Sequence, residues 1–243
     1  MNYDEIVARW QQSPISDAAD VEIKLHNFRI LFAYHSGKIE NDRIDYHDTR
    51  EIFENGRVSN YTGDVRTLFE QKNQKDCYEM LKSKIAAKTP FSIDLIKEIH
   101  LELSKGTYDE NRFSKGERPG EFKKNDYVVG YLDVGSDASD VEDDLDSVIE
   151  EVNSYRGSEI LKAAAYLHAS FENIHPFADG NGRVGRTIMN YHLIINDHPP
   201  IVIFEEDRKE YYKALEKFDK SEELDYLINF LKVQCEKTWN KRQ

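Results

Sequence analysis

The chain has 243 residues, of which 39% are hydrophobic and 33% charged, a balance typical of a globular protein with a well-solvated surface. Its formal net charge of −13 argues against a nucleic-acid duplex as its main partner, because a phosphate backbone binds a basic face. No apolar run reaches the roughly 18 residues of a membrane span, and the N-terminus lacks a basic and then apolar leader, so we expect no membrane segment and a cytoplasmic protein.

Apolar residues that recur at three- and four-residue steps predict amphipathic helices in the N-terminal part of the chain. The second helix begins near Asp17 or Asp20, either of which can cap it. His100 lies on an apolar helix and is interpreted as a core residue. Proline and glycine mark several helix ends. The predicted helices are 3–12, about 20–41, 47–56, 63–87 and 92–104.

The segment 117–135 breaks this helical pattern. An Arg-Pro-Gly turn signal at 118–120 precedes the stretch 127–132, which is rich in β-branched and aromatic residues. We therefore predict a short β-hairpin within 117–135. Its edge residues and its register stay open.

Helical patterns return after the hairpin. One helix is acidic on its solvated side and carries Val141, Leu145 and Val148 on its buried side. The next carries Leu167 and ends before Pro176, because the residue ahead of a proline is pushed out of the α region. The rest is predicted to be a helix from about Arg183, a short buried or edge segment at 201–204, and helices at 205–218 and 222–239.

The loop between the two central helices, residues 175–186, reads His-Pro-Phe-Ala-Asp-Gly-Asn-Gly-Arg-Val-Gly-Arg. Its glycines permit positive φ, so the backbone N–H groups at 180–183 can turn inward at the positive end of the following helix. Such an arrangement forms an anion-binding nest. A phosphate group would fit there.

Four side chains of this loop suit phosphate chemistry. Asp179 offers hard oxygen ligands for Mg²⁺, which commonly takes one or two carboxylates together with substrate phosphates. Arg183 and Arg186 are three residues apart and can each fork onto phosphate oxygens. His175 can accept a proton from an incoming hydroxyl group.

The same stretch resembles the signature of the Fic family, HPFx(D/E)GNGRxxR, with every fixed position present. The resemblance extends from the mid-30s to the C-terminus. It implies a single Fic domain over 1–243, a mostly α Fic-type helical bundle with a small β-hairpin flap at about 117–135 and a catalytic loop at 175–186. The implied activity is that of a protein adenylyltransferase, which transfers AMP from ATP, with Mg²⁺, to a Ser, Thr or Tyr hydroxyl of a target protein docked on the flap.

The resemblance also implies roles for individual residues. His175 is the catalytic base, and Asp179 holds the metal. Which tyrosine faces the adenine base stays open. The implied phosphate-binding residues are Gly180, Asn181, Gly182, Arg183 and Arg186, and the implied nucleoside-pocket residues are Tyr211, Tyr212 and Leu215.

Residues 36–41, Ser-Gly-Lys-Ile-Glu-Asn, resemble the (S/T)xxxE(G/N) inhibitory motif of the family, placed N-terminal to the catalytic loop as in its class II members. Ser36 and Glu40 are four residues apart and share a helical face, so the hydroxyl can hold the carboxylate. In the family this glutamate pairs with the second signature arginine and keeps the ATP γ-phosphate from seating. We therefore expect Glu40, on an inhibitory helix at about 20–41, to meet Arg186.

Other hypotheses stay open. A different group transfer on the same fold is conceivable, although the intact Gly-Asn-Gly-Arg argues for ATP. A de-AMPylating hydrolase could use the same site, with Glu40 positioning a water. A non-enzymatic regulator that senses ATP belongs to another class of protein. The target protein and residue type, self-modification and a homo-oligomer also stay open.

Overall fold

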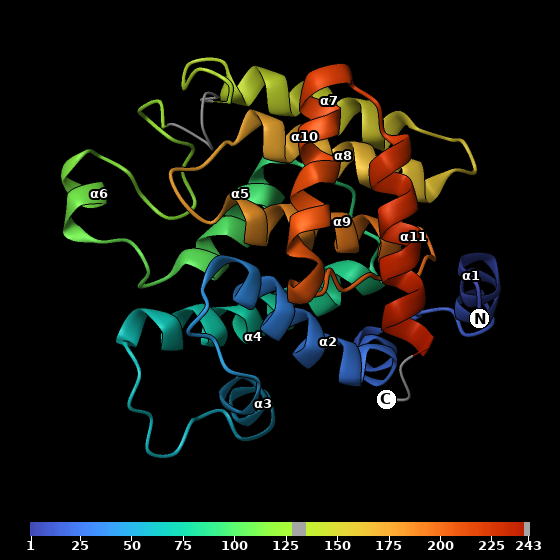
Figure 1. The fold of residues 1–243 in the computed structure, drawn as a ribbon, viewed down its shortest axis with the longest axis horizontal. Helices are drawn as coiled ribbons and strands as arrows, with labels where there is room; N and C mark the ends of the chain where they lie inside the picture. Colours follow the sequence, from blue (N-terminus) through green and yellow to red (C-terminus); the bar gives the residue numbers. More distant parts are fainter. Residues whose placement is uncertain (128–134, 241–243) are drawn as a thin grey trace.

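The computed structural model describes residues 1–127 and 135–240, in which eleven α-helices and one 3₁₀ turn pack around the central pair α8 and α9 (Figure 1). Within these ranges no helix is both long and apolar enough to cross a bilayer. The elements are α1 (Tyr3–Gln11), α2 (Ala18–Glu40), α3 (Tyr46–Asn55), α4 (Val65–Ala86), α5 (Ile93–Ser104), α6 (Glu110–Ser114), α7 (Val141–Ser154), α8 (Ile160–Ile174), α9 (Asn181–Ile195), η1 (Glu205–Asp207), α10 (Arg208–Ser221) and α11 (Asp225–Asn240).

Local caps explain where the predicted helices begin and end. The Asp17 carboxylate accepts hydrogen bonds from two backbone N–H groups in the first turn of α2, at 2.8 and 2.9 Å. Ser92 caps α5 in the same way, through the N–H of Leu95 at 3.1 Å. Helix α3 ends at Gly56, whose φ of 73° lies in the left-handed region. The longer helices predicted from periodicity are confirmed, apart from a 3₁₀ turn that opens the one at 205–218.

The predicted hairpin is not seen in the described part of 117–135. Residues 117–127 contain no strand, and 128–134 lie outside the described residues. The buried carboxylate of Glu117 organises the segment instead, because it accepts hydrogen bonds from the backbone N–H of Lys124 and the side chains of Asn125 and Tyr127. The segment also joins the catalytic loop, since the N–H of Lys123 donates to the carbonyl of Pro176 at 2.9 Å.

Two smaller features were not predicted. Helix α6 has only five residues, too few to show periodicity, and begins at the Asp109 cap. The segment 201–204 is buried, as expected, but forms no strand. The backbone N–H groups of Ile201 and Phe204 are satisfied by side chains of Asn190 and Gln234.

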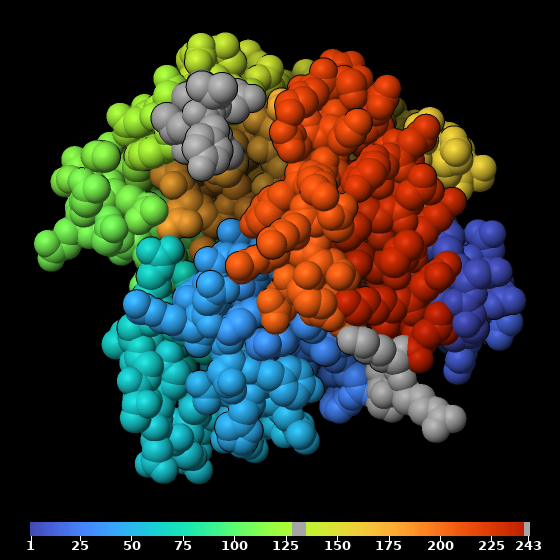
Figure 2. All heavy atoms as spheres, in the orientation of Figure 1, coloured from blue at the N-terminus to red at the C-terminus, as the bar shows by residue number. Residues whose placement is uncertain are grey.

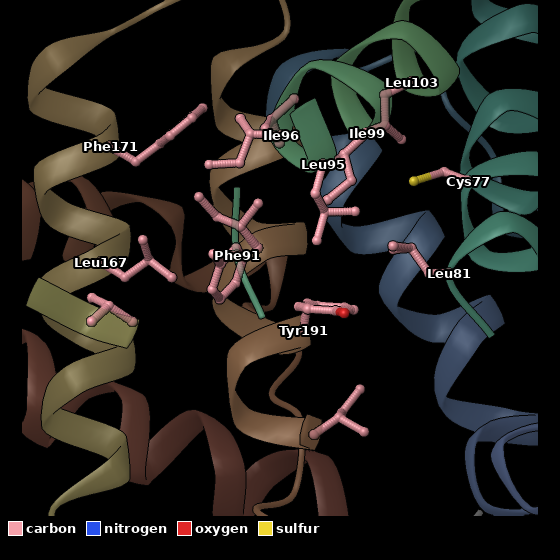
Figure 3. Close-up of a cluster of buried hydrophobic side chains, with 14 of the residues drawn as sticks. Cys77, Leu81, Phe91, Leu95, Ile96, Ile99, Leu103, Leu167, Phe171 and Tyr191 are labelled. Atoms are coloured by element: carbon pink, nitrogen blue, oxygen red, sulfur yellow. The ribbon is translucent and has the colours of Figure 1, made fainter. Parts of the chain in front are cut away.

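Helices α8 and α9 are held from both sides by hydrophobic clusters. Figure 3 shows Leu167 and Phe171 of α8 facing Phe91, Ile96 and other apolar residues around α5, with Tyr191 of α9 beside them. A second cluster packs α10 and α11 against the opposite side of the pair. The catalytic loop therefore joins two helices whose positions the core fixes.

Helix α2 packs along α4 and α9, so its last turn reaches the beginning of α9 (Figure 1). The helix runs unbroken through Gly37. A Cβ atom on Gly37 would lie 2.5 Å from Cδ1 of Ile44, so the side chain of Ile44 packs closely against this glycine where the chain folds back after α2. The two described ends of the chain meet on one side, where the Met1 amino group donates to the Asn240 side chain at 2.7 Å.

Replacement of Ile99 by alanine tests the core. Ile99 is 0% exposed, so Ile99→Ala removes buried methylene groups and leaves a cavity that lowers the free energy of unfolding by about 2–5 kcal/mol. Urea denaturation measures this loss. The matched control is Ile23→Ala, also on a helix but 77% exposed, which should change stability by less than about 0.5 kcal/mol. Equal losses in the two variants would contradict the packing described above.

Candidate active site

Hydrogen bonds among its own residues and with the end of α8 hold the loop 175–186 in place. Helix α8 ends at His175, which has a left-handed backbone (φ 52°, ψ 60°) and donates its N–H to the Phe171 carbonyl at 3.0 Å. Gly180, with φ 84°, precedes α9. The Asn181 side chain donates to the carbonyl of Phe177 at 2.7 Å and accepts from its N–H at 2.9 Å. The Asn181 amide, predicted to bind phosphate, therefore also holds the loop.

His100 contacts the loop 175–186 through its ring and through a hydrogen bond. It is fully buried, as expected of a core residue, and its ring stacks on Phe177 with centroids 3.7 Å apart. Its Nδ1 accepts a hydrogen bond from the Gly120 N–H at 2.8 Å, so Nε2 carries the proton and donates to the Asp179 carbonyl at 3.0 Å. Burial lowers the pKa of His100 to about 3, which keeps the ring neutral.

His175 is a half-buried imidazole at the cleft. Burial, and to a smaller extent the positive charge of Lys123, lowers the pKa of His175 to about 4. The ring is therefore neutral at physiological pH. A neutral imidazole has a free lone pair and can accept a proton.

Asp179 lies between two arginines that no motif pointed to. Its Oδ2 is 2.9 Å from Nη2 of Arg66 on α4 and 3.1 Å from Nη2 of Arg112 on α6. Burial alone would raise the pKa of Asp179, but Arg183, Arg112 and Arg66 together hold it below its ordinary value. The side chain is therefore a carboxylate throughout the physiological range.

The donor set fits a metal ion that substrate helps to hold. Within the described ranges there is no group of three or more His, Cys, Asp and Glu side chains that could bind a metal unaided. Asp179 supplies one ionised carboxylate to the cleft, and Mg²⁺ commonly needs only one or two when phosphate oxygens and waters complete its shell.

The end of α2 closes one side of the site. Glu40 Oε1 lies 2.9 Å from Nη2 of Arg186, so the predicted contact is present. Ser36, which we expected to position Glu40, binds the arginine: its hydroxyl accepts from Nε at 3.0 Å and its carbonyl from Nη2 at 2.8 Å. Arg186 is 1% exposed, and its Nη1 has no hydrogen-bond partner among the described residues.

The three residues predicted for the nucleoside pocket have different environments. Tyr211 is fully buried, and its hydroxyl lies 2.8 Å from Nε2 of His168. Leu215 is also buried. Tyr212 is 46% exposed on α10. Only Tyr212 of the three offers a large accessible surface to a ligand.

Helix α8 buries a second acid beside Arg186. Burial raises the pKa of Glu172 to about 8 and lowers the pKa of His168 to about 3. At neutral pH most of the Glu172 is protonated and His168 is neutral, so the 3.9 Å contact between Oε1 and Nδ1 is not an ion pair. Both atoms lack a hydrogen-bond partner in the described part of the chain.

A cleft of about 370 Å³ lies between the end of α2, the beginning of α4 and the loop 175–183. Figure 2 shows this face hollowed between the blue end of α2, the green segment after α5 and the orange α10. No side chain caps the first backbone N–H groups of α9, since the residue before the helix is Gly180, and residues 180–183 line the cleft. The residues that line the cleft include Glu40, Arg66, His175, Asp179, Gly182 and Arg183.

Comparison with known families matches the part of the chain that contributes residues 175–183 to this cleft. Residues 90–193, from the start of α5 to most of α9, match the model of the Fic/DOC family. Protein adenylyltransferase Fic from Drosophila persimilis is 28% identical over 216 residues, which is 84% of this chain and 39% of that protein. The Drosophila erecta protein of the same name is also 28% identical, over 84% of this chain and 40% of that protein. The chain therefore spans about two fifths of the length of these relatives.

Solved structures show the same fold. A Fic-domain-containing signalling protein from Bacteroides thetaiotaomicron superposes with a TM-score of 0.81 at 21% identity, covering 98% of this chain and 94% of that one. Fic-1 from C. elegans superposes with a TM-score of 0.75 at 22% identity, covering 97% and 71%.

The raised pKa of Glu172 predicts how the free energy of unfolding depends on pH. Its pKa is raised from 4.5 to about 8, so the folded chain binds one more proton than the unfolded chain between these values, and the free energy of unfolding falls as pH rises through that window. Glu172→Gln should remove this fall and be stabilising near pH 8. Urea unfolding at about pH 5 and pH 8 measures it, with Glu150→Gln, an exposed residue of α7, as the control. A wild-type slope that persists in Glu172→Gln would refute the assignment.

Proposed function

We propose that this chain, whose residues 90–193 form a Fic/DOC domain, is a protein adenylyltransferase that transfers AMP from ATP to a Ser, Thr or Tyr hydroxyl group of a target protein. One observation carries the proposal: a neutral imidazole, an ionised carboxylate and an uncapped helix N-terminus share one cleft. The relatives named protein adenylyltransferase Fic, which match 84% of this chain, support it.

His175 performs the proton transfer. Its neutral ring accepts the proton of the target hydroxyl as that oxygen attacks the α-phosphorus of ATP. A phosphorus–oxygen bond forms to the target, the bond from the α-phosphorus to the bridging oxygen breaks, and pyrophosphate leaves. Asp179 would hold Mg²⁺ together with the phosphates, and the bound ion would supply charge neutralisation. The products are an AMP–protein ester and pyrophosphate.

The beginning of α9 receives the phosphates. Its first backbone N–H groups point into the cleft at the positive end of the helix dipole. A Cβ atom on Gly182 would collide with the Glu40 carboxylate, so a side chain there would fill the space that an anion uses. Arg183 is nearly buried and donates to the Leu103 carbonyl at 3.2 Å, which fixes its guanidinium beside Gly180.

The nucleoside is assigned to the side of the cleft bordered by α10. Of the expected residues, Tyr212 has the accessible ring, and the pKa of its hydroxyl is raised by burial and then by the charge of Glu40. Tyr211 and Leu215 support this wall from the core. A target protein docks on the segment 117–135, whose residue Lys123 is bonded to the catalytic loop.

Glu40 restrains the reaction. Its carboxylate and a phosphate group are both anions that bind a guanidinium group, so they compete for the side of Arg186 that Glu40 occupies. The γ-phosphate of ATP must displace Glu40 to reach Arg186. Removal of the Glu40 side chain therefore frees the arginine.

The first test replaces Glu40. Wild type and Glu40→Gly are incubated with Mg²⁺ and ATP labelled at the α-phosphate, and AMP label is measured on a cell lysate and on the protein itself. Labelling should be about tenfold or more stronger for Glu40→Gly than for wild type. The loss of about 1.4 kcal/mol of competition by Glu40 corresponds to a factor of ten. The matched control is Glu54→Gly near the end of α3, because Glu54 and Glu40 are 42% and 39% exposed. The control should label like wild type.

The second variant tests the base. In the Glu40→Gly background, His175→Ala should lower the labelling rate by about 10² to 10⁴. His47→Ala, an exposed histidine of α3, is the control. An unchanged rate in His175→Ala would contradict the assignment of the base. Absence of label from every variant that still binds ATP would contradict the transferase and point to AMP removal or ATP sensing.

A further inference from the structure

Arg66 and Arg112 come from helices far from the catalytic loop in sequence and converge on one oxygen atom. Their Nη2 atoms lie 2.9 and 3.1 Å from Oδ2 of Asp179. Asp179 also lies near Arg183, whose charge helps to lower its pKa. Arg112 also pairs with Asp109, its Nη1 lying 3.1 Å from Oδ2 of that residue. Asp179 therefore shares one oxygen atom between two guanidinium groups, and several positive charges lie close together in a partly buried place.

The guanidinium of Arg66 is held in this place by a second acid. Its Nε donates to Oε1 of Glu70 at 3.0 Å, across one turn of α4. Glu70 is itself nearly buried, and its Oε2 accepts a hydrogen bond at 2.7 Å from Asn41, the residue after Glu40. Arg66 is thus tied to the wall of the cleft and directed toward Asp179, although its side chain is 43% exposed.

A divalent cation that approaches Asp179 alone meets unfavourable charge. It must displace two guanidinium groups from the carboxylate or share the carboxylate with them, and the cations repel one another in either case. A phosphate group that arrives with the cation changes this balance, because it offers the displaced guanidinium groups new anionic oxygens. Cation and phosphate then stabilise each other's binding.

We propose that Arg66 and Arg112 form a phosphate-binding pair that Asp179 neutralises in the free protein, so that a divalent cation enters the cleft only together with the phosphates of a nucleotide. The pair adds two phosphate ligands to those of the catalytic loop and makes metal binding conditional on nucleotide. The inference rests on the proposed function for the identity of the nucleotide. Its physical basis is the convergence of both arginines on the metal-binding carboxylate.

The experiment measures binding without transfer. Two ligands are titrated separately into the Glu40→Gly protein and into the same protein with Arg66→Ala and Arg112→Ala added. Binding of Mn²⁺ alone is followed by the electron paramagnetic resonance signal of the free ion. Binding of metal-free α,β-methylene-ATP is followed by calorimetry. The double variant should bind Mn²⁺ alone about three- to tenfold more tightly and the metal-free nucleotide about three- to tenfold more weakly, the range expected for two partly exposed ion pairs. The matched control is Arg50→Ala, which removes an arginine from a similar i,i+4 pair on α3.

Opposite shifts for metal and nucleotide would support the pair, since a purely structural loss weakens both. Mn²⁺ binding that stays at the parent value or weakens would overturn the proposal, and so would unchanged nucleotide binding. If circular dichroism shows the double variant unfolded, Arg66→Ala and Arg112→Ala singly make the same comparison. Failure of the proposed function is distinguishable, because it would show as missing AMP transfer in the parent, which these titrations do not involve.

Discussion

A guanidinium group buried in the centre of a helical bundle is the constraint on which the rest depends. Arg186 lies on α9 at 1% exposure, and a buried charge is costly unless an anion accompanies it. In the free chain that anion is Glu40, supported by two oxygen atoms of Ser36. Removing the anion without replacement leaves the charge unpaired. The molecule therefore needs either the end of α2 or a ligand phosphate at this position.

The same logic applies across the cleft. Asp179 forms ion pairs with Arg66 and Arg112, as Glu40 does with Arg186. The arginines on both sides of the site are therefore paired with carboxylates of the protein itself. Nucleotide and metal binding would exchange these internal pairs for external ones. The neutral His175 and the protonated Glu172 add no charge to this balance at physiological pH. The surrounding helices hold the groups in place through the two apolar clusters.

Much of this arrangement could be predicted from the sequence, because periodicity fixes long helices and the 175–186 stretch carries a full signature. The contact of Glu40 with Arg186 followed from a motif at the end of a helix. The pairing of Asp179 with Arg66 could not be predicted, since no local pattern connects residues 113 positions apart. Neighbouring tyrosines such as Tyr211 and Tyr212 cannot be told apart without the packing that buries one of them.

The roles of polar side chains that organise loops also could not be predicted from the sequence. Asn181 belongs to the signature, and its amide also holds the loop through two hydrogen bonds with the backbone of Phe177, which the signature did not indicate. The carboxylate of Glu117 shapes 117–127, the described part of the segment in which a hairpin was predicted. Both residues form local side-chain to backbone hydrogen bonds, which compete with regular secondary structure and leave no periodic trace in the sequence.

The most direct test of competition at Arg186 compares ATP and AMP binding by calorimetry in wild type and in Glu40→Gln, which keeps the size of the side chain and removes its charge. If Glu40 and the terminal phosphate compete for Arg186, ATP should bind about tenfold more tightly to the variant, whereas AMP, which lacks that phosphate, should bind both proteins equally. An equal change for ATP and AMP, or no change for ATP, would contradict the account.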